Sequence, residues 1–152
     1  MIINPELLSP CGLYCGVCGI RIAWKQGNQA LKEKLAKAYG LKPEEIKCEG
    51  CLAAPEKVFV YCKICPIKTC VKQKKHESCA QCPDFPCEHI NQFPYPEAKK
   101  VILKAIPRWR ELGTEKWVAE EEKRYLCPAC GKAVFRGAHR CPGCKTQLAI
   151  DI

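Results

Sequence analysis

The chain has 152 residues, fifteen of them cysteine, and a formal net charge of +9 with neutral histidines. This length suits one ordinary domain or two small ones, and so high a cysteine content is typical of a disulfide or a metal scaffold. Because no apolar run approaches a membrane span and the first residues do not read as a secretion signal, we expect no membrane contact and a cytoplasmic location.

The cysteines favour metal binding over disulfides. Cytoplasmic thiols stay reduced, an odd number of cysteines cannot all pair, and C-x2-C spacings recur as in metal-binding loops. Metal-bound cysteines are thiolates, so fifteen negative thiolates and the eight positive charges of four Zn²⁺ ions would bring the formal charge from +9 to about +2. The basic composition therefore says little about nucleic-acid binding.

The first predicted helix spans about residues 28–39. Leu31, Leu35 and Ala38 recur at i, i+4 and i+7 and give an apolar stripe, while Gly40 suits the C′ position that ends a helix. The lysines of this segment lie off the stripe, and we interpret them as a solvated face.

An internal repeat follows, in which the spacing C-x2-C-x4-C occurs twice, seventeen residues apart. Pro66 and Pro86 can each occupy the first position of a helix. We therefore expect two related metal loops, each turning into a short helix that carries its third cysteine inward. The cysteines of the two copies are Cys62, Cys65 and Cys70, then Cys79, Cys82 and Cys87.

Residues 93–125 contain no cysteine and are predicted to form a helical arm. Pro96 begins one helix, which Pro107 ends or kinks. Gly113 stops the second piece, and Thr114 supplies an N-cap for a last helix. The arm would join two metal-rich ends.

Residues 126–152 are predicted to form a small zinc ribbon. The CPACG and CPGCK segments are typical of tight turns in which two sulfurs face one ion, and Gly131 would permit the close approach. Residues 132–136 and 147–152 can form short strands. The four expected ligands are Cys127, Cys130, Cys141 and Cys144.

The remaining cysteines allow several groupings. One array repeats the ribbon spacing, and the seven other thiols are one short of two four-ligand sites, which His76 or His89 could complete. Pairing residues 15 and 18 with residues 48 and 51 is equally allowed. We expect three or four zinc ions and interpret every cysteine as a ligand. The array is Cys48, Cys51, Cys62 and Cys65, and the seven others are Cys11, Cys15, Cys18, Cys70, Cys79, Cys82 and Cys87.

Metal should also be needed for folding. Short loops rich in proline and lysine bury little apolar surface, whereas a structural zinc contributes roughly 10 to 16 kcal/mol of apparent binding free energy. We expect the first ninety residues not to hold together without it.

Iron is the main alternative to zinc. Cys11, Cys15 and Cys18 have the spacing of radical S-adenosylmethionine enzymes, but those enzymes need a β/α barrel or a large part of one, on the order of 200 residues, and no such pattern exists here. One ordinary iron–sulfur cluster on N-terminal thiolates stays open. Because no hydrolytic triad, phosphate loop or H-E-x-x-H helix is present, nothing indicates an enzyme.

Four motifs resemble an uncharacterised family of bacterial and archaeal cysteine-rich domains, the domain-of-unknown-function family 3795. The resemblance covers about residues 8–93, and the rest looks like a helical arm and zinc ribbon that some members append. It implies zinc, a cytoplasmic location and a prokaryotic origin, and it adds no mechanism. The motifs are CGLYCGVC (11–18), KCEGC (47–51), CKICPIKTC (62–70) and CAQCPDFPCE (79–88).

The expected fold is small, α+β and α-rich: a metal-stabilised cysteine-rich domain (1–92), a helical arm (93–125) and a C-terminal zinc ribbon (126–152). The main functional hypothesis is a structural zinc protein that acts as a protein-interaction or scaffold module, with Trp109 and Trp117 as core and docking aromatics.

Two alternatives to the scaffold stay open. The first is a nucleic-acid-binding zinc protein whose arginines contact phosphates. The second is an iron–sulfur or redox protein that uses the N-terminal cysteines. The arginines of the first alternative are Arg108, Arg110, Arg136 and Arg140.

Overall fold

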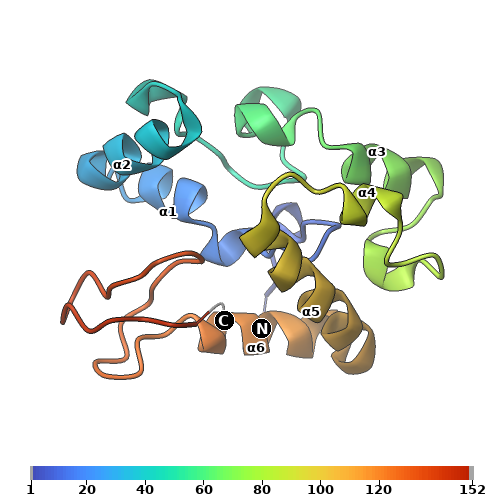
Figure 1. Cartoon of the computed structure of the whole chain (residues 1–152). Coiled ribbons are helices and arrows are strands. Elements are labelled where there is room, and N and C mark those ends of the chain that lie inside the picture. The colour runs from blue at the N-terminus through green and yellow to red at the C-terminus, as the bar shows by residue number, and fades with distance from the viewer. Residues whose placement is uncertain (1, 151–152) are drawn as a thin grey trace.

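A computed structural model describes residues 2–150, and its regular structure is almost entirely helical (Figure 1). The α-helices of the described part are α1 (Gly19–Lys25), α2 (Gln29–Tyr39), α3 (Pro66–Gln73), α4 (Glu88–Asn91), α5 (Pro96–Leu112) and α6 (Thr114–Arg124). Short 3-10 helices are η1 (Pro5–Leu7), η2 (Cys15–Val17), η3 (Pro43–Glu45), η4 (Pro55–Lys57), η5 (Val60–Cys62) and η6 (Cys79–Gln81). No helix within residues 2–150 has the length and apolar character needed to cross a membrane.

The expected β structure is much reduced. Within the described residues it consists of two isolated antiparallel bridges, Leu126 with Ala133 and Arg140 with Gln147. The α-rich character is confirmed, but residues 132–136 and 147–150 do not form the expected strands, and residues 151–152 lie outside the described part.

Helix α5 crosses the middle of the molecule and α6 packs against it (Figure 1). Pro96 begins α5 as expected, but the helix continues through Pro107, so the expected end there is wrong. Pro107 cannot donate a hydrogen bond to the carbonyl of Leu103. Both residues are exposed, so water can satisfy that carbonyl and the helix tolerates the proline.

The two tryptophans of the arm are core residues. Trp109 and Trp117 stack with ring centroids 4.1 Å apart and planes 4° apart, and the exposed fraction of Trp117 is 0%. The indole N–H of Trp109 donates to the hydroxyl of Thr114 at 2.9 Å. Thr114 is the first residue of α6 and Gly113 is the N-cap, so the expected N-cap role of Thr114 is wrong. The expectation that these tryptophans lie on a docking surface is wrong, because both are buried.

The main core joins the N-terminal region, the arm and the ribbon. The backbone N–H of Arg136 donates to the carbonyl of Val17 at 2.8 Å, and its guanidinium donates to the carbonyl of Tyr14 at 3.0 Å. The hydroxyl of Tyr14 donates to Glu122 of α6 at 2.8 Å. Buried members of this core include Leu7, Tyr14, Val17, Ile67, Ile90, Ile102, Ile106, Trp117, Val134 and Leu148.

Helices α1 and α2 form a second, smaller core. The expected bounds of α2 are confirmed, since Asn28 accepts from the N–H of Leu31 at 3.1 Å and Gly40 ends the helix with φ 70°. The buried face is rotated from the expected stripe, because Ala36 is buried and Ala38 is exposed. The sequence reasoning had missed α1. The buried residues of the second core are Ile20, Ala23, Ala36, Ile46, Cys48 and Phe59.

The two short helices of the cysteine repeat differ in how they begin. Pro66 is the first residue of α3, as expected. Helix α4 begins at Glu88, with Cys87 as its N-cap in an extended conformation, so Pro86 precedes the helix instead of opening it. The second repeat therefore places its third cysteine at the helix entrance.

Candidate metal centre

Four cysteines of the C-terminal region converge on one point. The ligand atoms of Cys127, Cys130, Cys141 and Cys144 all lie within 4.8 Å of one another. The sulfurs of Cys127 and Cys144 are 3.6 Å apart, as are those of Cys130 and Cys141. Because a tetrahedral zinc ion lies about 2.3 Å from each thiolate, its sulfurs are about 3.8 Å apart. The predicted ligands are thus at the spacing that one metal ion requires.

Two similar backbone turns create this arrangement. The N–H of Gly131 donates to the carbonyl of Cys127 at 2.8 Å, and the N–H of Lys145 donates to that of Cys141 at 3.0 Å. Both fifth residues have positive φ, 75° for Gly131 and 65° for Lys145. A Cβ at Gly131 would meet no protein atom within 4 Å. This glycine supplies backbone conformation, not space.

The surroundings of two of these thiols favour the thiolate. Hydrogen bonding to Thr146 lowers the pKa of Cys144 to about 6. Backbone hydrogen bonding, first from Cys144, lowers the pKa of Cys141. Since a metal binds the deprotonated thiol, both contacts assist coordination. Cys127 and Cys141 are buried while Cys130 and Cys144 are exposed, so the site lies at the surface but rests on the core.

The N-terminal cysteines are close to one another but less converged. Among residues 2–150, no further set of three or more His, Cys, Asp or Glu ligand atoms meets the 4.8 Å spacing. The array at residues 48, 51, 62 and 65 is therefore not brought together in the manner of the ribbon. Six of the eleven are buried, namely Cys11, Cys15, Cys48, Cys51, Cys79 and Cys82, and Cys18, Cys62, Cys65, Cys70 and Cys87 are half-buried.

Seven of these cysteines, from the CGLYCGVC, KCEGC and CKICPIKTC motifs, lie near one another. The N–H of Cys51 donates to the sulfur of Cys15 at 3.3 Å, and the Cys11 sulfur lies 3.1 Å from the hydroxyl of Ser9. Burial raises the pKa of Cys11 to about 11, whereas a hydrogen bond with Cys15 lowers the pKa of Cys51 to about 7. Burial, followed by the nearby Cys18 thiol, raises the pKa of Cys62. The CGLYCGVC and KCEGC motifs thus face each other.

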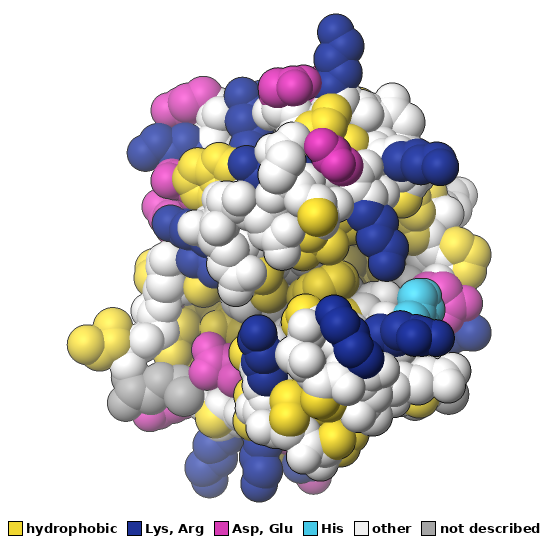
Figure 2. Space-filling view, turned by 90° about the vertical axis from the view of Figure 1, so that its left-hand side faces the viewer, with side chains coloured by type: hydrophobic (Ala, Val, Ile, Leu, Met, Phe, Trp, Pro, Cys, Tyr) yellow, Lys and Arg dark blue, Asp and Glu magenta, His cyan; other side chains and the backbone are white. Residues whose placement is uncertain are grey.

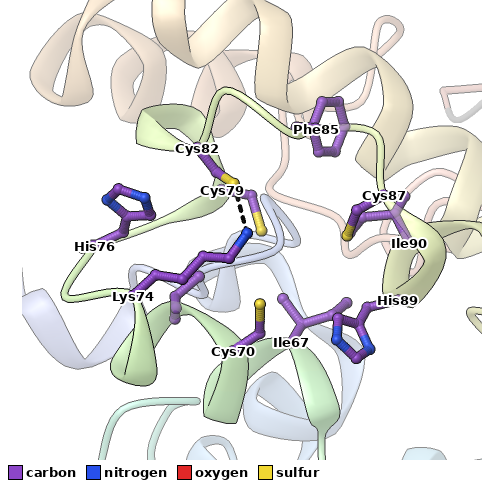
Figure 3. Close-up of a pocket in the computed structure, with 11 residues that line it drawn as sticks. Ile67, Cys70, Lys74, His76, Cys79, Cys82, Phe85, Cys87, His89 and Ile90 are labelled. Carbon is purple, nitrogen blue, oxygen red and sulfur yellow. Dashed lines mark hydrogen bonds between the residues drawn. The ribbon is translucent and has the colours of Figure 1, made fainter.

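The other four N-terminal cysteines border a separate small cavity near α3 and α4 (Figure 3). His76 and His89, the two candidate completing ligands, also border it. His76 is half-buried and His89 is exposed. The sequence analysis assigned Arg110 to phosphate contact and connected neither Arg110 nor Lys74 with the cysteines, although both contact this region, and no spacing signal in the chain marks such a role. The cavity cysteines are Cys70, Cys79, Cys82 and Cys87.

Three of the four arginines proposed for nucleic-acid contact already have partners within the protein. Arg108 pairs with Glu111 at 2.7 Å and with Glu120 at 2.9 Å. Arg110 donates to backbone carbonyls near Cys79, and Arg136 to that of Tyr14.

Surface charge on one side of the molecule gives a similar picture. On the face that Figure 2 shows, basic side chains are spread among acidic ones rather than gathered into one patch. This face therefore presents no concentrated basic surface of the kind that marks a nucleic-acid-binding protein.

Comparison with known proteins covers the N-terminal part of the chain. The family model described as "Protein of unknown function (DUF3795)" matches residues 7–92. No curated protein and no solved structure matches the chain. The family match includes all eleven N-terminal cysteines and ends before α5, so the four converged C-terminal cysteines lie beyond it.

Proposed function

The chain belongs to the DUF3795 family of proteins of unknown function, and on that premise we propose that it is a structural zinc protein that acts as a scaffold for a protein partner. It would work in the cytoplasm of a prokaryote and perform no catalytic step. The observation that carries the zinc assignment is the convergence of four cysteine ligand atoms within 4.8 Å. Four thiolates and no open position are typical of structural rather than catalytic zinc.

Zinc at this site would complete a minimal zinc ribbon. Each pair of ligands belongs to a turn, and each turn is flanked by one antiparallel bridge. Cys127 and Cys141 belong to the main core together with Val134 and Leu148. An ion bound here would therefore hold the ribbon closed and keep its two apolar residues against the arm.

A protein partner is supported by an exposed apolar patch, which we define as Val60, Tyr61, Ile64 and Tyr95. The exposed fraction of Ile64 is 82%, and those of the other three exceed 40%. Exposed apolar side chains that lie on a rigid base are typical of interaction sites.

The aromatic base of the apolar patch is well ordered by its contacts. The ring centroid of Tyr39 lies 6.0 Å from that of Tyr61 and 6.1 Å from that of Tyr95. The hydroxyl of Tyr61 also donates to the backbone carbonyl of Tyr39 at 3.0 Å. The rings therefore present a preformed surface at little entropic cost.

The segment that carries Val60, Tyr61 and Ile64 is basic, although Lys68 donates to backbone carbonyls and Lys74 pairs with Asp84. Residues 58–76 contain five lysines and no acidic residue. A partner segment that combines apolar side chains with Asp or Glu would complement both features. This patch replaces the buried tryptophans as the docking surface of the scaffold hypothesis.

Elemental analysis of anaerobically purified protein tests the zinc assignment. We expect zinc in the wild-type chain and one zinc fewer in Cys127→Ser/Cys130→Ser, with the helical circular dichroism retained. An unchanged zinc content in that variant would refute the ribbon site. Iron with acid-labile sulfide and a brown colour would instead identify an iron–sulfur protein.

Cross-linking and affinity capture with Ile64→Asp test the scaffold role. A specific partner should be lost from Ile64→Asp and kept by Leu103→Asp, a matched change at an exposed apolar residue of α5. Retention of generic single- or double-stranded nucleic acid at low salt, released as salt rises, would favour nucleic-acid binding instead.

A further inference from the structure

Four cysteines from three separate segments border one cavity. Cys70 comes from α3, Cys79 and Cys82 from the turn at η6, and Cys87 from the entrance of α4. In Figure 3 the sulfurs of Cys70, Cys79 and Cys87 point toward a common space, and Cys82 lies at its edge. None of the four belongs to the converged C-terminal group.

The size of this cavity suits a single ion. Its volume is about 10 Å³, which is the room that one water-sized sphere occupies. Ile67, Phe85 and Ile90 form the apolar part of its wall.

We propose that Cys70, Cys79, Cys82 and Cys87 form a second zinc site, separate from the ribbon. Four soft ligands around a space for one ion are the donor set of a closed tetrahedral zinc centre. On binding, each thiol releases its proton to solvent, and the four sulfurs rotate inward to surround the ion. The remaining seven N-terminal cysteines then belong to the neighbouring cluster formed by the CGLYCGVC and KCEGC motifs together with Cys62 and Cys65.

A lysine beside the site offsets part of its charge. Four thiolates and one divalent cation carry a net charge of −2. The ammonium group of Lys74 lies 3.6 Å from the Cys82 sulfur and 2.9 Å from an Asp84 carboxylate oxygen. Lys74 therefore supplies a nearby positive charge while Asp84 anchors it outside the ligand shell.

Arg110 of α5 acts as a positioning residue for the turn. Its guanidinium donates to the carbonyl of Ala80 at 2.8 Å and to that of Cys79 at 3.3 Å, and it also donates to the carbonyl of Cys82. It lies over the Phe85 ring, 5.5 Å from the centroid. These contacts fix the segment that carries two ligands and connect the site to the arm, as outer contacts of metal ligands commonly do.

The histidines that border the cavity are not needed as ligands. Four thiolates complete the coordination of zinc, so His76 and His89 remain outside it. His76→Ala and His89→Ala should therefore leave the zinc content unchanged. A loss of one zinc in either variant would overturn the four-thiolate assignment.

Alkylation of the wild-type chain tests the grouping without any mutation. Zinc-loaded protein is treated with a chelator in increasing amounts, pulsed with a thiol alkylator, and mapped by mass spectrometry. We expect Cys70, Cys79, Cys82 and Cys87 to become reactive together. Independent reactivity of the four, or full reactivity of any of them in the zinc-loaded chain, would overturn the proposal.

Paired variants separate this site from the ribbon. Cys79→Ser/Cys82→Ser should lose one zinc while the four ribbon cysteines stay protected. Cys127→Ser/Cys130→Ser should lose one zinc while Cys70 and Cys87 stay protected. Unchanged zinc in the first variant alone refutes the second site, and unchanged zinc in the second alone refutes the ribbon site.

Arg110→Met tests the positioning role, with Lys104→Met as a control at an exposed position of the same helix. In Arg110→Met, the proposed second zinc site should lose its zinc to a chromophoric chelator about ten times faster than in wild type. Removing residues that contact metal ligands commonly weakens metal binding by at least this factor. The control should match wild type. A lowered melting temperature with unchanged transfer would show a merely structural role and overturn the assignment.

Discussion

The two cysteine-rich ends of this protein organise their thiols in different ways. In the ribbon, four cysteines within residues 127–144 converge to 4.8 Å through turns closed by their own backbone. In the N-terminal region, distant segments hold the cysteine loops. Lys68 donates to the carbonyls of Cys51 and Cys62 at 2.7 and 3.3 Å, and Arg110 does the same for Cys79.

This difference shows that the geometry of metal ligands can be set either by local turns or by long-range packing. The array at residues 48, 51, 62 and 65 has the same spacing as the ribbon cysteines but does not converge, so the ribbon is assembled by its backbone-closed turns and not by spacing alone. Buried cysteines that share the core with Leu7, Tyr14 and Val17 depend on the packing of the whole molecule. The grouping of these cysteines therefore depends on the tertiary structure. Metal removal and substitutions should affect the ribbon and the N-terminal region differently.

Removal of metal should have the largest effect. In reduced protein treated with a strong chelator, we expect loss of the cooperative thermal transition, because each structural zinc contributes roughly 10 to 16 kcal/mol, as much as the whole stability of a small domain. Circular dichroism and calorimetry measure the change, and added zinc should restore the transition. A chelated, reduced sample that still melts cooperatively would contradict metal dependence at both ends.

Trp117→Ala should have the next largest effect, because this residue belongs to the core that both ends share. Its indole is fully buried and stacks on Trp109. We expect a loss of about 3 to 5 kcal/mol in the free energy of unfolding of the zinc-loaded protein. Leu103→Ala, at an exposed position of α5, should change it by less than about 0.5 kcal/mol. If urea titrations gave equal losses of stability for Trp117→Ala and Leu103→Ala, the stacked tryptophans of the arm would not form the core that joins the two ends.

Two glycine substitutions compare the turns directly. A Cβ at Gly50, in the KCEGC motif, would lie 2.6 Å from the carbonyl oxygen of Glu6, and its φ is 142°. Gly50→Ala should therefore cost at least about 2 kcal/mol of stability. A Cβ at Gly131 would meet no atom within 4 Å. Gly131→Ala should therefore cost only about 1 kcal/mol of stability, which arises from the positive φ of this position. Thermal melts of the two zinc-loaded variants measure both stability losses. A larger loss in Gly131→Ala than in Gly50→Ala would show that the ribbon turn is the more constrained one.

Acid release of zinc should show the smallest difference. A proton competes with metal most strongly at a thiol whose pKa is high. Burial raises the pKa of Cys79 to about 12. In the ribbon, hydrogen bonding to Thr146 lowers the pKa of Cys144 to about 6, while Cys130, despite a backbone hydrogen bond from Lys132 that acts to lower its pKa, has it raised to about 11 by hydrogen bonding with the Cys141 thiol. Stability linked to metal is present at high pH and lost as pH falls. Because each site holds a thiol of raised pKa, both should release zinc at similar pH as the solution is acidified, as a fluorescent zinc indicator can follow in the paired cysteine variants; widely separated release would contradict this.

Local signals in the sequence predicted some local features, but Thr114 is not the N-cap of α6 and Pro86 does not open α4. Asn28 and Gly40 bound α2 as expected, because a cap needs only its neighbouring residues. The four ribbon ligands converge as their spacing indicates. The same reasoning expected Pro107 to end or kink its helix, but α5 continues through Pro107 because the affected carbonyl is exposed to solvent.

By itself, the sequence determined the helix-rich character, the family and one four-cysteine group, because caps, turns and short spacings act over a few residues. Only the tertiary structure decided that Trp109 and Trp117 are buried and which distant thiols are neighbours. The physical reason is that burial and long-range contact depend on how α5 packs across the molecule (Figure 1), and a residue such as Arg110 acquires its role from carbonyls about thirty positions away.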